Sequence, residues 1–281
     1  MTMQTGDRLF KALVSTTTRV MWGIAPETAM RLVAKGFFGA RSSKLYRESD
    51  ELFSTGQQFW VEAMGKRVKA WKWGRGPSVI LAHGWASRSR RMSSFVMPLV
   101  SAGHTVVAFD SLGHGESDGR ETNFFEYVES INKVMGRAGD VVGIVAHSMG
   151  AAAALNIQKV GCEKTRLALI APLYELQKGI YEYGKAIGIH PPMYEEMVGR
   201  IEKKHGKSLQ EVSPMAIAEK VDCHTLIVHD EGDKVAALIH SEKLVEQMKN
   251  ARLARTSGLG HGRILDDSET VAQVVSFISE A

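Results

Sequence analysis

The sequence lacks the features that mark several classes of protein. No apolar run in its 281 residues approaches the roughly 18 residues that a membrane-spanning helix requires. The chain has no glycine-rich phosphate loop, no zinc-ligand spacing and no basic stripe with interleaved aromatic residues. Its net charge is only +4, and the charges are dispersed. We therefore expect neither a nucleic-acid partner nor a metal site.

Cysteine is also scarce, since the chain contains only Cys162 and Cys223. They lie far apart and each is next to a predicted strand, so we expect reduced, buried thiols and a reducing compartment. Residues 1–7 do not combine a basic segment with a following apolar segment, and a signal peptide is therefore not expected. These observations predict a cytoplasmic location.

Residues 58–281 show alternating strand and helix patterns. With 44% hydrophobic residues, the chain can bury one large core, which favours a single elaborated α/β domain. The alternation predicts a mostly parallel, doubly wound sheet of about eight strands. It stops at residues 172–222, where we expect a helical cap inserted after the sixth strand. The expected strands are 58–63, 68–73, 78–82, 105–109, 140–146, 165–170, 224–229 and 251–256.

Residues 1–57 form a predicted helical N-terminal extension. Apolar residues recur there at roughly helical spacing, and the segment 25–28 is typical of the start of a second helix. Packing of these helices against the domain is the simpler interpretation, and a peripheral contact with an anionic membrane surface is the alternative. The basic residues of this segment, against the single acidic Glu27 between residues 8 and 47, are Arg8, Lys11, Arg19, Arg31, Lys35, Arg41, Lys44 and Arg47.

The segment 141–150 has the pattern of a strand, a sharp turn and a helix, with Ser148 on the turn. Such a nucleophile elbow exposes the serine hydroxyl, and its consensus is Gly-x-Ser-x-Gly. This chain has Ala146 at the first glycine position and keeps Gly150 at the second. Both positions require small side chains because the strand and the helix approach closely.

A base and an acid follow in the order that such enzymes use. Asp233 comes after the strand 224–229, and His261 comes after the strand 251–256. The carboxyl ends of parallel strands meet at one edge of the sheet, so we predict a triad of Ser148, Asp233 and His261. Asp230 is the alternative acid, but Asp233 is favoured because it lies further into the loop, from which it can turn back toward the histidine.

With these motifs the chain resembles the α/β-hydrolase fold superfamily, in particular its serine esterases and lipases, over about residues 58–281. His83-Gly84-Trp85 is similar to the oxyanion-loop motif of that superfamily, and the segment 109–117 is similar to its following turn. The resemblance implies an oxyanion hole formed by the backbone N–H groups of Trp85 and Met149.

The predicted function is hydrolysis of a carboxylic ester through an acyl-enzyme, without a cofactor. The aromatic and methionine-rich cap suits an apolar acyl or alkyl group. We expect the pocket to include His83, Trp85, Tyr174 and Tyr181. The alternatives are a lysophospholipase or monoacylglycerol-type lipase, a thioesterase or C–C hydrolase, and a non-catalytic ligand-binding member of the fold. The oligomeric state is not predicted.

Overall fold

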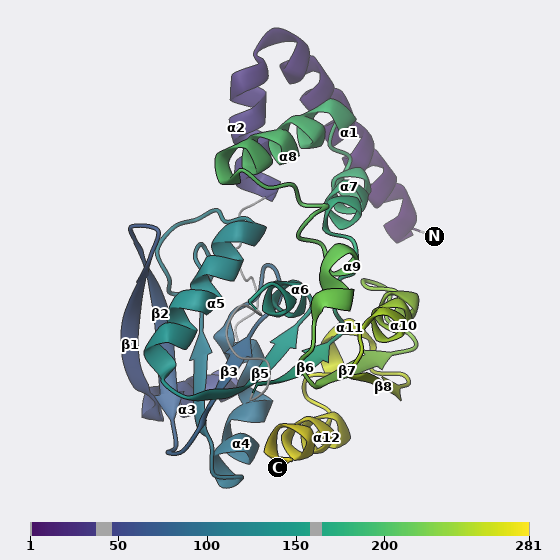
Figure 1. The fold of residues 1–281 in the computed structure, drawn as a ribbon. Coiled ribbons are helices and arrows are strands. Elements are labelled where there is room, and N and C mark those ends of the chain that lie inside the picture. Colours follow the sequence, from purple (N-terminus) through teal and green to yellow (C-terminus); the bar gives the residue numbers. More distant parts are fainter. Residues whose placement is uncertain (1, 38–46, 158–164, 281) are drawn as a thin grey trace. The chain divides into compact units, whose positions relative to one another are not determined.

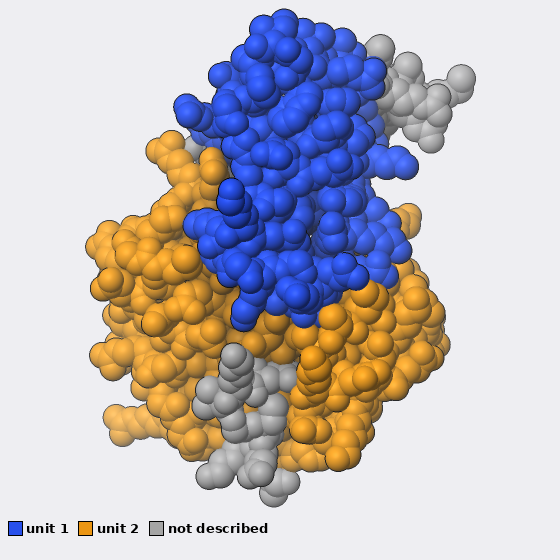
Figure 2. All heavy atoms as spheres, turned by 45° about the horizontal axis from the view of Figure 1, so that its top comes forward, with its two compact units in different colours: residues 1–39, 175–213 blue, residues 40–174, 214–281 orange. Residues whose placement is uncertain are grey.

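The computed structural model describes residues 2–37, 47–157 and 165–280 (Figure 1). Its contacts divide the chain into two compact units, which Figure 2 distinguishes by colour. Unit 1 comprises residues 1–39 and 175–213, and unit 2 comprises residues 40–174 and 214–281. The N-terminal helices are therefore grouped with the inserted helices, whereas the sequence suggested an extension ending at residue 57 and a cap over 172–222.

Unit 2 contains an eight-stranded sheet with the order β1-β2-β4-β3-β5-β6-β7-β8. The pairs β1–β2 and β2–β4 are antiparallel, and every other neighbouring pair is parallel. This confirms the predicted fold class. The strands are β1 (Gln57–Ala63), β2 (Lys66–Trp73), β3 (Ser78–Ala82), β4 (Thr105–Phe109), β5 (Val141–His147), β6 (Arg166–Ile170), β7 (Thr225–Asp230) and β8 (Ala251–Thr256).

Helices cover both faces of this sheet (Figure 1). One face packs against α3 (Arg47–Thr55), the 3₁₀-helix η1 (Ser89–Phe95), α4 (Val96–Ser101) and α12 (Ser268–Ser279). The other face packs against α5 (Phe124–Ala138), α6 (Met149–Leu155) and α10 (Leu238–Gln247). The remaining short helices of unit 2 are α9 (Pro214–Ile217), η2 (Ala218–Lys220) and α11 (Gly260–Arg263). Because both faces are covered, β3, β4 and β7 are buried along their whole length.

The helix α3 was not predicted from the sequence, and it belongs to the core of unit 2. Phe53 is 1% exposed and lies edge-on between Trp71 and Trp73, with ring centroids 5.1 and 5.0 Å away. The indole N–H of Trp73 donates to the carbonyl of Leu52 at 3.2 Å. These aromatic contacts lie between residues distant in sequence, so local spacing could not reveal them.

Unit 1 is a group of four long helices: α1 (Thr2–Ile24), α2 (Pro26–Phe37), α7 (Leu176–Ile187) and α8 (Pro191–His205). The second helix begins at Pro26, within the predicted start, because proline is favoured in the first helical turn. Arg200 of α8 forms two hydrogen bonds with the carboxylate of Glu27, at 2.6 and 2.9 Å. At Gly188, a Cβ atom would lie 2.6 Å from the carbonyl oxygen of Lys11. This close approach requires glycine.

The cysteine prediction requires a correction. Cys223 is 2% exposed and buried as expected, but it is disulfide-bonded rather than reduced. Cys162, the only other cysteine of the sequence, lies outside the described residues. Cysteine usage therefore no longer supports a reducing compartment. Within residues 2–37, 47–157 and 165–280, no helix is long and apolar enough to cross a membrane.

Candidate active site

Ser148 lies on a strained turn between β5 and α6. Its backbone has φ 52° and ψ −115°, a conformation that residues other than glycine rarely adopt. The turn is held by the Ser148 N–H group, which donates to the carbonyl of Ile170 at the end of β6, at 2.9 Å. Such strain persists only where the surrounding structure enforces it, and here it positions one hydroxyl at the carboxyl edge of the sheet.

Small residues allow α6 to begin close to the sheet. A Cβ atom at position 150 would lie 2.4 Å from the carbonyl oxygen of His83 and 2.7 Å from that of Ala82. The requirement for Gly150 therefore comes from the end of β3. Ala146 is fully buried between β3 and β6, where it pairs with Ala82 and Leu169. Its methyl group is accommodated, which explains why this position tolerates the departure from glycine.

His261 and Asp233 are in direct contact. The Nδ1 atom of His261 lies 2.7 Å from the Oδ2 atom of Asp233, although 28 residues separate them in sequence. The Asp233 side chain is fully buried, and that of His261 is 18% exposed. Since a carboxylate only accepts hydrogen bonds, Nδ1 of His261 is the donor, which leaves Nε2 of a neutral imidazole available to accept a proton.

Further contacts stabilise the ionised form of Asp233. Its Oδ1 atom accepts the backbone N–H groups of Val235 and Ala236, at 2.7 and 3.0 Å. The Nε2 atom of His229 lies 3.5 Å from Oδ2. Burial alone would raise the pKa of Asp233, but the hydrogen bonds from His229 and His261 outweigh it and hold that pKa well below its usual range. No pattern in the sequence indicated this contact between His229 and Asp233.

Asp230, the alternative acid of the sequence analysis, has a structural role. Its fully buried carboxylate accepts the Thr256 hydroxyl and the N–H groups of Gly232 and Leu259, each at 2.9 Å. Burial opposes ionisation, but these hydrogen bonds lower the pKa of Asp230. Asp230 thus fixes the loop that precedes His261 and does not bind its imidazole.

The predicted oxyanion loop lies next to Ser148. A Cβ atom added to Gly84 would lie 3.3 Å from Cβ of Ser148. Ala86 has φ 51°, and its N–H donates to Nε2 of His114 at 3.2 Å, which fixes the backbone after Trp85. Met149 is the first residue of α6, and the first N–H groups of a helix have no partner within the helix.

His83 supports this loop through its own hydrogen bonds, and its place in a substrate pocket stays a prediction. It is fully buried, and its Nε2 accepts the N–H of Ser111 at 3.1 Å. Its Nδ1 therefore carries the hydrogen and donates to the carbonyl of Gly84 at 2.7 Å. Burial lowers the pKa of His83, so the ring is neutral. The hydroxyl of Tyr127, which no local motif indicated, donates to the His83 carbonyl.

His147, the residue before Ser148, contacts the loop of the predicted base. Its Nε2 donates to the backbone carbonyl of His261 at 3.0 Å, and the two ring centroids are 4.6 Å apart. Burial, followed by repulsion from the charge of His261, lowers the pKa of His147 to about 3. His147 therefore stays neutral, and it connects the turn after β5 with the loop after β8.

The predicted pocket tyrosines have other contacts. The ring of Tyr174 is buried and stacks on His240 of α10, with centroids 6.0 Å apart. Tyr181 belongs to unit 1, where its ring lies 4.9 Å from that of Tyr194 and its hydroxyl accepts the side-chain amide of Gln177 at 3.0 Å. Of the four predicted pocket residues, Trp85 is the one on the loop beside Ser148.

The described part of the chain contains no cluster of possible metal ligands. No group of three or more histidine, cysteine or acidic residues there is arranged to hold a metal ion. His261 and Asp233 form a hydrogen bond between their side chains, and Asp230 accepts one from the backbone N–H of Leu259.

Comparisons with known proteins agree with this fold. Residues 76–213 match a family described as serine aminopeptidase, S33. A non-heme haloperoxidase from Rhodococcus erythropolis is 25% identical over 256 residues, which cover 73% of this chain and 93% of that protein. An esterase from Exiguobacterium antarcticum superposes with a TM-score of 0.63 at 19% identity, over 80% of this chain and all of the esterase.

A second solved structure extends the comparison to another reaction. The meta-cleavage product hydrolase from Pseudomonas fluorescens IP01 has a TM-score of 0.59 and 20% identity, covering 78% of this chain and 96% of that protein. At these identities the structural likeness establishes the fold. The chain has the α/β-hydrolase fold, as its motifs and topology indicated.

Proposed function

We propose that this protein is a serine hydrolase that cleaves a carboxylic ester through an acyl-enzyme. The observation that carries the proposal is the partly buried Asp233–His261 hydrogen bond of 2.7 Å, formed beyond the ends of β7 and β8. Ser148 stands on the strained turn beyond β5 of the same sheet, and His147 connects that turn with the His261 loop. These contacts support a nucleophile, a base and an orienting acid at one edge of the sheet.

In this mechanism, Ser148 Oγ attacks the ester carbonyl carbon while Nε2 of His261 accepts the hydroxyl proton. The N–H groups of Trp85 and Met149 stabilise the negative charge on the carbonyl oxygen. The C–O bond to the alcohol breaks, and His261 returns its proton to the leaving oxygen. Water then attacks the acyl-enzyme with His261 again as base, which releases the acid and restores Ser148.

The first test is the substitution Ser148→Ala combined with a fluorophosphonate probe, which labels activated serines covalently. We expect the wild-type protein to be labelled and the variant to show neither labelling nor ester turnover, because triad members typically contribute several orders of magnitude to kcat. Residual turnover above about one hundredth of wild type would assign the nucleophile to another residue. Unchanged circular dichroism and thermal unfolding of Ser148→Ala serve as the folding control.

The second test separates this function from its alternatives. We expect p-nitrophenyl esters with apolar acyl groups to be better substrates than the corresponding thioesters, lysophospholipids or β-diketones. A preference for thioesters, lipids or C–C cleavage would move the protein to the corresponding alternative. Absence of turnover together with absence of fluorophosphonate labelling would identify a non-catalytic ligand-binding member of the fold. The cytoplasmic location stays a prediction.

A further inference from the structure

Unit 1 exposes a stripe of large apolar side chains on its N-terminal helices. Leu13, Val20 and Ile24 of α1 are 67%, 52% and 80% exposed, and Leu32 of α2 is 56% exposed. At about 100° per residue, positions 13, 20 and 24 lie within roughly 40° on one side of α1. Thr18, on another side of α1, is only 8% exposed. The helix therefore has a packed side and a separate apolar side that remains open.

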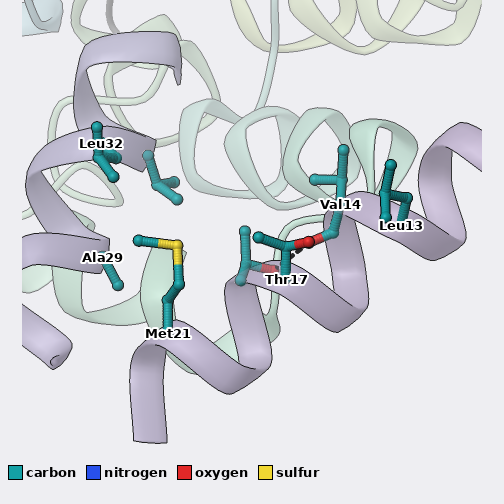
Figure 3. Close-up of a pocket in the computed structure, with 8 residues that line it drawn as sticks. Leu13, Val14, Thr17, Met21, Ala29 and Leu32 are labelled. Carbon is teal, nitrogen blue, oxygen red and sulfur yellow. Dashed lines mark hydrogen bonds between the residues drawn. The ribbon is translucent and has the colours of Figure 1, made fainter. Parts of the chain in front are cut away.

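An apolar groove between α1 and α2 continues this stripe (Figure 3). Its cavity volume is about 320 Å³. Leu13 and Leu32 both line the groove and are more than half exposed, so they lie at its open side. The hydroxyl of Thr18 donates to the carbonyl of Val14 at 2.8 Å, so the helix satisfies this polar group. The groove thus offers mainly apolar surface to an occupant.

The charges on α1 and α2 are mostly positive. The described side chains of residues 11–35 include Lys11, Arg19, Arg31 and Lys35, all exposed, and the single acidic residue Glu27. Glu27 is already paired with Arg200 of α8, as described above. Arg31 and Lys35 lie on α2 one and three residues from Leu32. The apolar stripe is therefore accompanied by an excess of positive charge.

We infer that this surface, defined by Leu13, Val20, Ile24 and Leu32 with Arg31 and Lys35, docks on a bilayer of anionic phospholipid. The apolar side chains enter the boundary between headgroups and acyl chains, and the arginine and lysine contact the lipid phosphates. A second copy of the chain is a poorer occupant, because two identical basic surfaces would face each other and repel. A free apolar ligand would satisfy the groove but would leave the positive charges without a partner.

The test is co-sedimentation of the full-length protein with vesicles of phosphatidylcholine alone and of equal parts phosphatidylcholine and phosphatidylglycerol. We expect binding to the anionic vesicles that weakens as salt shortens the screening length from about 8 Å to about 3 Å. Arg31→Gln combined with Lys35→Gln should weaken partition on the order of 30-fold, since each basic residue near the surface contributes about fivefold. Leu13→Ser and Ile24→Ser should each weaken it by about tenfold.

Matched control variants lie in unit 2. Met97 is 50% exposed and comparable to Val20, so Met97→Ser removes an exposed apolar side chain elsewhere. Arg75 is an exposed loop residue, so Arg75→Gln removes one positive charge elsewhere. Both controls should sediment as the wild-type protein does. The substituted residues of unit 1 are exposed, and thermal unfolding of each variant verifies that the fold is retained.

Three results would overturn the inference. Equal sedimentation with neutral and anionic vesicles would show that the charges do not contribute. Equal weakening by the unit 2 controls would show that the bound surface lies elsewhere. Absence of vesicle binding, together with a dimer on gel filtration that Leu13→Ser or Ile24→Ser dissociates, would make a second copy the occupant. Ester turnover is not part of this readout, so the result is independent of the proposed function.

Discussion

Replacing Asp233 by asparagine would test how the loop after β7 controls the base. In the wild-type protein, both carboxylate oxygens accept hydrogen bonds: Oδ1 from Val235 and Ala236, and Oδ2 from His261. An asparagine can keep its single oxygen on the two backbone N–H groups. Its NH₂ group then faces Nδ1 of His261 and donates where the carboxylate accepted. The imidazole is thereby held in the tautomer with hydrogen on Nε2, which cannot accept the proton of Ser148.

The expected loss is large because it affects the protonation of the base in every turnover. A wrong tautomer in a serine triad lowers kcat on the order of 10⁴-fold, equivalent to about 5 kcal/mol of activation free energy. The matched variant is Asp230→Asn, because Asp230 lies at the end of the same strand and accepts three hydrogen bonds without contacting His261. An asparagine there loses one or two bonds to a charged acceptor, so the free energy of unfolding should fall by about 2–4 kcal/mol.

The assay is kcat on a p-nitrophenyl ester at saturating concentration, with thermal unfolding of each variant. We expect Asp233→Asn to have the far lower kcat and Asp230→Asn to retain activity at temperatures where it is folded. If Asp230→Asn had the lower kcat while still folded, Asp230 would be the acid and the proposed triad would be wrong. A decrease of less than tenfold in Asp233→Asn would show that the contact with His261 does not set the tautomer.

Two further predictions concern the elbow. Gly150→Ala should give less folded protein and lower thermal stability, because its Cβ would lie 2.4 Å from the His83 carbonyl oxygen and α6 would have to move. Unchanged thermal unfolding and unchanged kcat would contradict this close approach. His147→Gln should make the free energy of unfolding less dependent on pH. The wild-type histidine has a pKa lowered from 6.5 to about 3 in the folded protein. It therefore favours folding above pH 6.5, and that contribution is lost as the pH falls toward 3. Between pH 7 and 4.5, His147 should account for a loss of roughly 2–3 kcal/mol in the free energy of unfolding. Urea unfolding with the same pH dependence in both proteins would show that the ring is not buried in its neutral form.

The sequence alone determined the fold class and the order of the chemical groups. All eight strands were predicted within two residues at each end. For β3, β4 and β7 the signal was a continuous apolar run bounded by turn residues, because these strands are fully buried. Ser148 was recognisable because a strand, a sharp turn and a helix are encoded within ten consecutive residues. Asp233 and His261 were proposed because the carboxyl ends of parallel strands converge.

The tertiary structure decided every feature that depends on contacts between distant segments. Asp230 and Asp233 are chemically identical and only three residues apart, and the path of the loop after β7 brings Asp233, not Asp230, to His261. The burial of a histidine could not be read from residue type: His83 is fully buried and forms hydrogen bonds with Ser111 and Gly84. The N-terminal helices are amphipathic by local periodicity, but their grouping with α7 and α8 depends on contacts such as the Glu27–Arg200 ion pair. Periodicity specifies which side of an element is apolar, whereas the partner of that side is chosen by the packing of the whole chain.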